Sequence, residues 1–194
     1  MPERAEHLDQ SPAAGPASPV KISNRGRVIY PESGLTKGEH QIEGINSRLD
    51  GMQAAILSVK LRHLDAWTQA RRDKAASYNA RLAGIVGLET PVEGEGCEHV
   101  YHLYVVRHDR RDELAAHLAA AGIQTVVNYP VALPFLPAYQ RFGHVPRDFP
   151  NAWANQGRIL SLPIFPEMHA SQQAHVAEAL HRFAEMRPDK SNKT

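Results

Sequence analysis

The sequence lacks the features that define several large classes of protein. Its single cysteine, Cys97, cannot form an internal disulfide bond, and it leaves a cysteine-based zinc site without partners. No apolar run approaches the roughly 18 residues that a membrane-spanning helix needs. The charged start, MPERAEHLDQ, has no apolar core of a secretory signal. We therefore expect a cytoplasmic protein with no membrane association.

An excess of charge of either sign is also absent. The 194 residues include 22 Lys and Arg against 21 Asp and Glu, and the signs are interspersed along the chain. Nucleic-acid and anionic-membrane surfaces are typically basic, so we expect no nucleic-acid partner. The length suffices for one domain of ordinary size with a buried core.

Common catalytic and metal-binding motifs are missing as well. The chain has no G-x-S-x-G, no phosphate-binding loop of the Walker type and no G-x-G-x-x-G. Among the 11 histidines there is no H-E-x-x-H, and His99 and His102 would lie on opposite faces of a strand. Asp112 and Glu113 are typical of the first turn of a helix. We expect no metal site.

The two ends of the chain and one early segment have little pattern. Residues 1–21 are rich in Pro, Ala and Ser and predict a disordered tail, and residues 188–194 predict a polar tail. Residues 22–48 are broken by Gly and Pro and predict loop, with a short strand at RVIY.

Residues 49–84 have the spacing of one long helix. Apolar side chains recur at intervals of three and four residues, and no proline interrupts them. Such a rod, about 50 Å long, exceeds what a small domain needs for its own core, so we expect it to pack on something else too and to expose apolar surface. The apolar positions are Leu49, Met52, Ile56, Leu57, Val59, Leu61, Leu64 and Trp67.

Residues 85–187 alternate between strand and helix patterns, which predicts a small α/β domain with a sheet of about three strands covered by helices. The expected strands lie in 98–109, 123–130 and 159–166, and the expected helices in 110–123, 149–160 and 171–186.

The stretch GINSRLDGMQAAIL, residues 44–57, places turn-forming and charged residues directly before the long helix. Ser47 or Asp50 could cap that helix, which is the simpler interpretation from spacing alone. The amide of Asn46 and the guanidinium of Arg48 are also good donors to a phosphate.

The same stretch resembles a known family. G-x-N-S-R-L-D-x-x-Q-A-A-I-L from Gly44, W-x-x-x-R from Trp67 and YNARL from Tyr78 are followed by HVYHLYVVRHDRRDEL, GIQTVVNYPVALPFLPAY and ILSLPIFPEM. These blocks, in this order over residues 22–183, resemble the DegT/DnrJ/EryC1/StrS family of pyridoxal-phosphate-dependent sugar aminotransferases.

The resemblance implies the small C-terminal domain of the fold-type I aminotransferase architecture, preceded by its interdomain helix. It implies dimers that use pyridoxal 5'-phosphate, an amino donor and a keto-sugar nucleotide. Asn46, with Arg48 beside it, would reach the phosphate of the cofactor held by the neighbouring subunit. Asn128 and Tyr129 would line the substrate pocket, although a packing role for Tyr129 is an equal alternative.

The chain departs from the family pattern in the loop after Tyr129. Many relatives have a histidine facing the nucleotide-sugar pocket where this chain has Pro134. Ala132 replaces a proline and Leu136 a glutamine. A polar substrate contact has become apolar, which puts the usual substrate in doubt.

No lysine has the neighbours of the family's Schiff-base lysine, so we expect no catalytic residue in this chain and no activity of the chain alone. We expect a C-terminal fragment of such an enzyme that assembles as a homodimer or with a full-length relative. Two alternatives stay open: a non-enzymatic partner module of a relative, or part of a family dehydratase or regulator. The lysines are Lys21, Lys37, Lys60, Lys74, Lys190 and Lys193.

Overall fold

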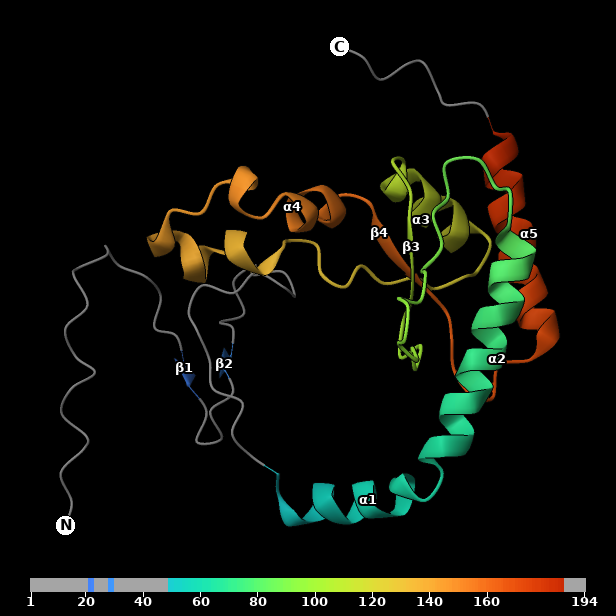
Figure 1. Ribbon diagram of the computed structural model, residues 1–194, viewed down its shortest axis with the longest axis horizontal. Helices are drawn as coiled ribbons and strands as arrows, with labels where there is room; N and C mark the ends of the chain where they lie inside the picture. The colour runs from blue at the N-terminus through green and yellow to red at the C-terminus, as the bar shows by residue number, and fades with distance from the viewer. Residues whose placement is uncertain (1–20, 23–27, 30–48, 187–194) are drawn as a thin grey trace.

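A computed structural model describes residues 21–22, 28–29 and 49–186 of the protein (Figure 1). It has an α/β architecture with one small antiparallel sheet in the main body and a separate strand pair near the start. The α-helices are α1 (Gly51–Leu61), α2 (Leu64–Leu82), α3 (Arg111–Ala120), α4 (Pro150–Gln156) and α5 (Ala170–Glu185). The strands are β1 (Lys21–Ile22), β2 (Val28–Ile29), β3 (Tyr104–Arg107) and β4 (Ile159–Leu162), and the 3-10 helices are η1 (Leu133–Phe135), η2 (Pro137–Phe142) and η3 (Pro146–Asp148).

The predicted single helix over residues 49–84 is two helices, so that expectation was wrong. α1 ends at Leu61 and α2 begins at Leu64, and the backbone N–H of His63 donates to the carbonyl of Lys60 at 3.0 Å. This bond of the i to i+3 type closes a tighter turn than an α-helix allows, and the chain changes direction there (Figure 1).

The first of these helices begins with the cap that spacing alone favoured. The Asp50 carboxylate accepts a hydrogen bond from the Gln53 N–H at 2.9 Å. This satisfies one of the free donors of the first turn and fixes where α1 starts. Ser47, the other candidate cap, lies outside the described residues.

The sheet is smaller than predicted. β3 pairs with β4 in antiparallel register, with Tyr104 opposite Leu162 and Arg107 opposite Ile159. The third expected strand, 123–130, contributes only one isolated antiparallel bridge, between Val126 and Ser161. Pro130 has no N–H to donate, and the segment leaves the sheet after this bridge. The expected three-stranded sheet is therefore a two-stranded sheet with two isolated bridges, the second one between Glu89 and Arg107 of β3.

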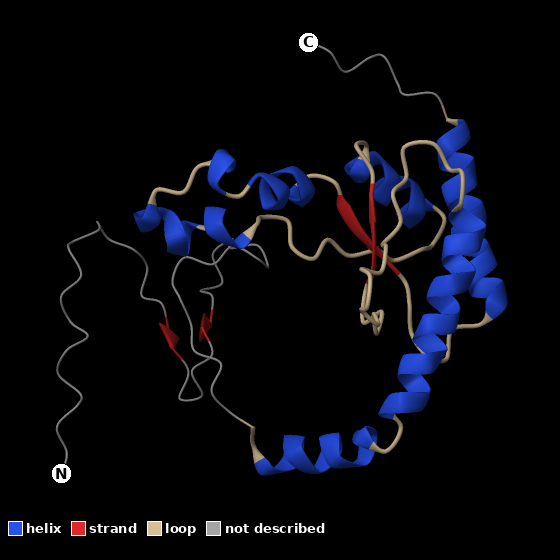
Figure 2. Ribbon diagram, viewed as in Figure 1, coloured by secondary structure: helices blue, strands red, loops and turns tan. Residues whose placement is uncertain are grey.

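The core lies between this sheet and three helices, and Figure 2 shows α2 and α5 side by side at one edge of it. Tyr78, Tyr104, Leu114 and Leu180 are all fully buried there, one each from α2, β3, α3 and α5. Before residue 49 the structure describes only β1 and β2, which pair antiparallel. The short strand expected at RVIY is thus confirmed at Val28–Ile29, and Lys21 belongs to β1 rather than to a tail.

Candidate functional site

The two residues expected to line a substrate pocket lie on the loop that leaves the sheet. The backbone of Val126 is bonded to Ser161 in both directions, at 3.2 and 2.8 Å. On the far side, the N–H of Ala132 donates to the Gln156 side chain at 2.9 Å, which ties the loop to α4. Asn128 and Tyr129 therefore sit on a short span held at both ends.

Within this span the side chain of Tyr129 is 73% exposed, whereas Asn128 is half-buried. The peptide bond between the two residues is cis. Because its ring is exposed, Tyr129 does not pack into the core of the described part of the chain. The position is open to a ligand or to another protein surface.

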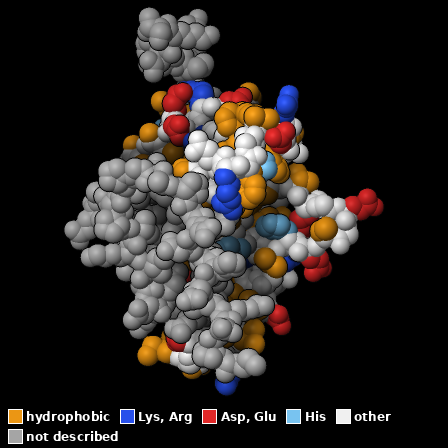
Figure 3. Space-filling view, turned by 90° about the vertical axis from the view of Figure 1, so that its left-hand side faces the viewer, with side chains coloured by type: hydrophobic (Ala, Val, Ile, Leu, Met, Phe, Trp, Pro, Cys, Tyr) orange, Lys and Arg blue, Asp and Glu red, His pale blue; other side chains and the backbone are white. Residues whose placement is uncertain are grey.

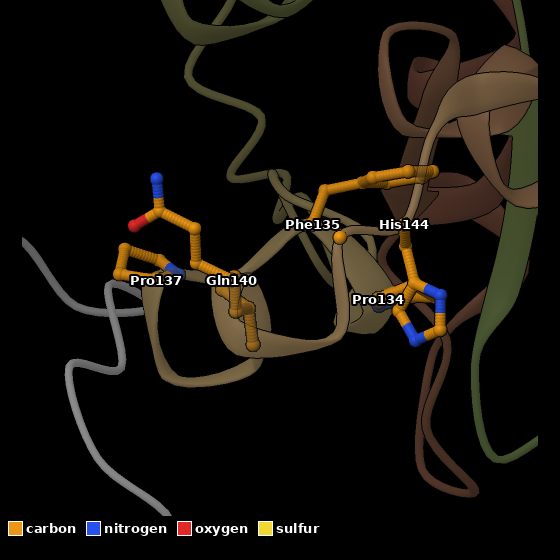
Figure 4. Close-up of a pocket in the computed structure, with 7 residues that line it drawn as sticks. Pro134, Phe135, Pro137, Gln140 and His144 are labelled. Atoms are coloured by element: carbon orange, nitrogen blue, oxygen red, sulfur yellow. The ribbon is translucent and has the colours of Figure 1, made fainter.

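Pro134 and Leu136, the apolar replacements, have different surroundings. Leu136 is only 5% exposed and packs inward, so an amide at this position would be buried. Pro134 lines a hollow of about 370 Å³ between η1 and η2 (Figure 4). Leu136 also belongs to the lining of this hollow, so both apolar replacements alter its wall, although Leu136 is the more deeply buried of the two.

The hollow combines aromatic and polar walls. The ring of Phe135 meets that of Trp153 edge to face, with centroids 5.0 Å apart, and His144 packs against Phe149 at the same distance. Gln140 and His144 are the polar side chains of the lining, and they lie on opposite sides of the close-up in Figure 4. Neither polar residue was singled out from the sequence, because no motif marks them and only the folding of η1 and η2 brings them to Pro134.

Several residues of the recognised blocks meet each other and hold the fold. Arg71, of the W-x-x-x-R block, donates to the carbonyl of Ile164 at 3.0 Å, and Tyr78 donates to the neighbouring carbonyl of Pro163 at 3.0 Å. Asn79 accepts a 2.6 Å hydrogen bond from the Tyr104 hydroxyl. These residues of α2 are thus used to fasten the segment after β4 and strand β3.

An ionic network closes the other end of β3 and β4. Arg158 bonds Glu89 at 2.7 Å and Asp109 at 2.6 Å, and Arg107 also pairs with Glu89. The hydrogen bond from Arg158 lowers the pKa of Glu89. All of these side chains are substantially exposed, so the network orders the surface rather than forming a catalytic pair.

Helix α1 carries the exposed apolar surface that the sequence predicted. None of its residues is buried, and Figure 3 shows hydrophobic side chains at the lower end of the molecule, at the height where Figure 1 places α1. The apolar side chains that are at least half exposed in and beside this helix are Leu49, Met52, Ile56, Leu57, Val59, Leu61 and Leu64.

The remaining sequence-based candidates fall into two groups. Asn46 and Arg48 lie outside the described residues, as do Lys37, Lys190 and Lys193, and their roles stay predictions. Lys60 and Lys74 lie on α1 and α2, as expected. Within the described ranges there is no group of three or more His, Cys, Asp or Glu side chains that could hold a metal ion. Nor does that part of the chain contain a helix long and apolar enough to cross a membrane.

Curated relatives match most of this chain. It is 43% identical over 165 residues to the "Pleiotropic regulatory protein" of Geobacillus stearothermophilus. The aligned residues make up 84% of this chain and 44% of the relative. It is 39% identical over 165 residues to the "dTDP-3-amino-3,4,6-trideoxy-alpha-D-glucose transaminase" of Streptomyces venezuelae. This alignment covers 85% of this chain and 44% of that relative. The chain thus spans less than half the length of these relatives.

Solved structures match the same portion. The crystal structure of S. venezuelae DesV in complex with a ketimine intermediate has a TM-score of 0.68 and 39% identity, over 86% of this chain and 43% of that one. A DegT DnrJ EryC1 StrS aminotransferase from Brucella abortus has a TM-score of 0.66 and 30% identity, over 85% and 42%. The model of the DegT/DnrJ/EryC1/StrS aminotransferase family matches residues 21–181. Together with the shared fold, this shows that the chain belongs to the DegT/DnrJ/EryC1/StrS aminotransferase family.

Proposed function

We propose that this chain is the C-terminal part of a pyridoxal-phosphate-dependent aminotransferase that acts on keto-sugar nucleotides. The observation that carries the proposal is the 39% identity to a sugar transaminase over 165 residues. In this assignment, α1 and α2 form the connection between two domains, and residues 85–187 form the small domain. The break between α1 and α2 is compatible with this role, since two helices joined by a tight turn can also connect two domains.

Asn46 and Arg48 are the residues of this chain that we assign to the cofactor. The donor set fits a phosphate, because an amide N–H and a guanidinium both donate to anionic oxygens. The sequence places them directly before Asp50, whose capping bond fixes the start of α1. The cofactor, when bound, supplies the electron sink for the exchange of the amino group. The role of these two residues is to orient it by its phosphate across a subunit interface.

Asn128 and Tyr129 are assigned to the substrate. Their loop is held at Val126 and at Ala132, so their side chains are presented from a fixed backbone. The amide of Asn128 can donate to or accept from a sugar hydroxyl, and the exposed ring of Tyr129 can pack against a sugar face. Positioning of this kind lowers the entropy lost when the substrate reacts.

The chain supplies no Schiff-base lysine in this proposal and does not transaminate alone. The test mixes the purified chain with pyridoxal phosphate, glutamate and a keto-sugar nucleotide, and follows cofactor absorbance and amino-sugar formation. We expect neither a protein-bound cofactor spectrum nor product. Turnover by the chain alone would contradict this part of the proposal.

The regulator alternative has one observation in its favour. The relative with 43% identity is named a pleiotropic regulatory protein rather than a transaminase. A complementation test distinguishes the two functions. The chain is supplied with the part of a transaminase that it does not match, and amino-sugar formation is measured. Product would favour the aminotransferase. Assembly without product would favour the regulator or the non-enzymatic partner module.

A further inference from the structure

Three basic side chains surround one phenyl ring where α3 meets the end of α5. The ring is that of Phe183, which is only 3% exposed. The imidazoles of His108 and His117 pack against it, with centroids 5.4 and 5.5 Å away. The guanidinium carbon of Arg110 lies 4.7 Å from the centre of the same ring. Because histidine gains its charge between pH 5 and pH 8, acid can add cations to this buried contact.

The two histidines use their ring nitrogens in opposite ways. Nδ1 of His108 accepts a 2.9 Å hydrogen bond from the backbone N–H of Arg110, so this nitrogen carries no proton and the neutral ring is protonated at Nε2. Nε2 of His117 lies 3.0 Å from the carbonyl oxygen of Ala179, which only accepts, so here the ring donates. Protonation of the imidazole therefore breaks the bond of His108 and leaves the bond of His117 intact.

The bond that His108 would lose holds the residue that joins the two helices. Arg110 is the N-cap residue of α3. Its guanidinium donates to the Glu113 carboxylate in the first turn of α3, at 2.6 and 2.9 Å. It also donates to the carbonyl of Met186, at the end of α5, at 3.4 Å. His108 thus fixes the backbone of Arg110, whose side chain fastens α3 to α5.

The surroundings of His108 leave little room for a charged ring. The side chain is 8% exposed, and a Cβ atom at Gly87 would lie 3.2 Å from Nε2. Each of the two acids beside it is already paired with one of the two arginines beside it, so neither acid is reserved for an imidazolium. Burial is the main cause that lowers the pKa of His108. The charged groups that act on it are Arg110 and Glu113 of α3, Asp109 next to it in the chain and Arg158 just before β4.

We propose that His108, Arg110 and Phe183 form an acid-sensitive clasp, in which protonation of His108 releases the start of α3 from the end of α5 while the β3–β4 sheet stays folded. In the protonated clasp two N–H groups face each other, and a second cation lies beside the guanidinium of Arg110. Opening the clasp lets the imidazolium reach water. The clasp is closed above the ordinary histidine pKa of about 6.5 and loosens as the pH falls below it. The inference does not depend on the proposed function, since it uses only contacts within the main body.

The test follows hydrogen exchange of the full chain at pH 7.5 and pH 5 without denaturant. Each rate is divided by the intrinsic rate at that pH, so that only protection by structure is compared. The amide of Leu114 donates to the Arg110 carbonyl at 2.9 Å, and that of Met186 donates to the Phe183 carbonyl at 3.1 Å. We expect the protection of both amides to fall roughly tenfold at pH 5, with the amides of the β3–β4 ladder unchanged.

Two glutamine variants separate the trigger from its neighbour. His108→Gln supplies an amide oxygen that can still accept from the Arg110 N–H but does not titrate, so the loss of protection at pH 5 should disappear. His117→Gln removes the other imidazole from the same phenyl ring and should keep the full loss, because His117 is a donor in both of its charge states. A purely structural role of the two rings would affect both variants alike.

Four results would overturn the clasp. The first is protection of Leu114 and Met186 that does not change between the two pH values. The second is an undiminished loss in His108→Gln, and the third is an abolished loss in His117→Gln. The fourth is a simultaneous loss in the β3–β4 ladder, which would show unfolding of the whole body.

If His108→Gln does not fold, the parent chain decides. In an NMR titration of the parent, the amide signal of Arg110 and the ring signals of His108 should shift with one common midpoint. Different midpoints for the two residues would end the proposal.

Discussion

The hydroxyl of Tyr78 donates a hydrogen bond to the carbonyl oxygen of Pro163 at 3.0 Å, joining α2 to the segment after β4. Tyr78 is fully buried, and its burial, together with Tyr104 nearby, raises the pKa of the hydroxyl. The hydroxyl therefore stays protonated at neutral pH and remains a donor there.

Removing this donor should destabilise the main body. Tyr78→Phe leaves the Pro163 carbonyl without this partner, and we expect a loss of about 1–2 kcal/mol in the free energy of unfolding. Urea unfolding followed by tryptophan fluorescence measures it. Tyr129→Phe removes the same atom from an exposed ring and should change stability by less than about 0.5 kcal/mol. Equal stability of Tyr78→Phe and the parent would show that the bond adds nothing.

The Asp50 cap should govern α1 without affecting the core. Asp50→Ala removes the acceptor for the Gln53 N–H, which typically costs about 1 kcal/mol of helix stability. Since α1 buries no side chain in the described fold, we expect faster hydrogen exchange in residues 52–61 and an unchanged midpoint of global unfolding. A matched change in a loop, Glu95→Ala, should alter neither. A fall in the global midpoint would mean that α1 is coupled to the core.

Acid should weaken the fold through His108. Burial lowers the pKa of this imidazole, with a further lowering from Arg110, while Asp109 and Glu113 act in the opposite direction. Its ring packs edge to face on Phe183, and Nδ1 accepts a hydrogen bond from the Arg110 N–H.

The sign of the effect follows from that lowered pKa. The unfolded chain binds a proton at the ordinary histidine pKa of about 6.5, while the folded chain resists it, so stability falls as the pH drops below about 6.5. We expect His108→Gln to reduce the stability lost between pH 7.5 and pH 5, measured by urea unfolding at each pH. His169→Gln, at an exposed position, serves as the control and should keep the parent's pH dependence. An identical pH dependence in His108→Gln would contradict the assignment.

The substrate loop should affect binding but not folding. In the complementation test, with the chain supplied with the part of a transaminase that it does not match, Asn128→Ala and Tyr129→Ala should raise the KM for the keto-sugar nucleotide, by about tenfold for each lost hydrogen bond or ring contact. Their unfolding midpoints should match the parent, because Tyr129 is exposed and the loop is held by Val126 and Ala132. Unchanged KM in both variants would remove these residues from the substrate site.

The helices α3 and α5 were predicted from local sequence patterns alone. The α3 helix has Asp112 and Glu113 in its first turn, as expected, and α5 occupies nearly the predicted range. Its start differs by one residue from the expected 171, and the N–H of His169 donates to the Gln172 side chain at 2.8 Å in the first turn. The glutamine reaches back to the backbone as in a capping box, an arrangement that the apolar spacing does not reveal.

Features set by tertiary structure were beyond local patterns. Leu57, Leu61 and Leu64 keep helical spacing straight across the turn at Arg62 and His63, so periodicity alone could not reveal the break. Residues 123–130 have strand composition, yet only Val126 forms a β-bridge. Gln140 and His144 meet Pro134 only because the 3-10 turns fold over one another.

The turn between α1 and α2 separates a helix without buried side chains from the part of the chain that forms the core. Within residues 49–186, every buried side chain follows it, from Ala75 onward. A polypeptide that starts at residue 64 would thus retain all of these buried side chains and lack the exposed apolar side chains of α1. Because such a variant lacks this exposed apolar surface, we expect it to self-associate less than the parent.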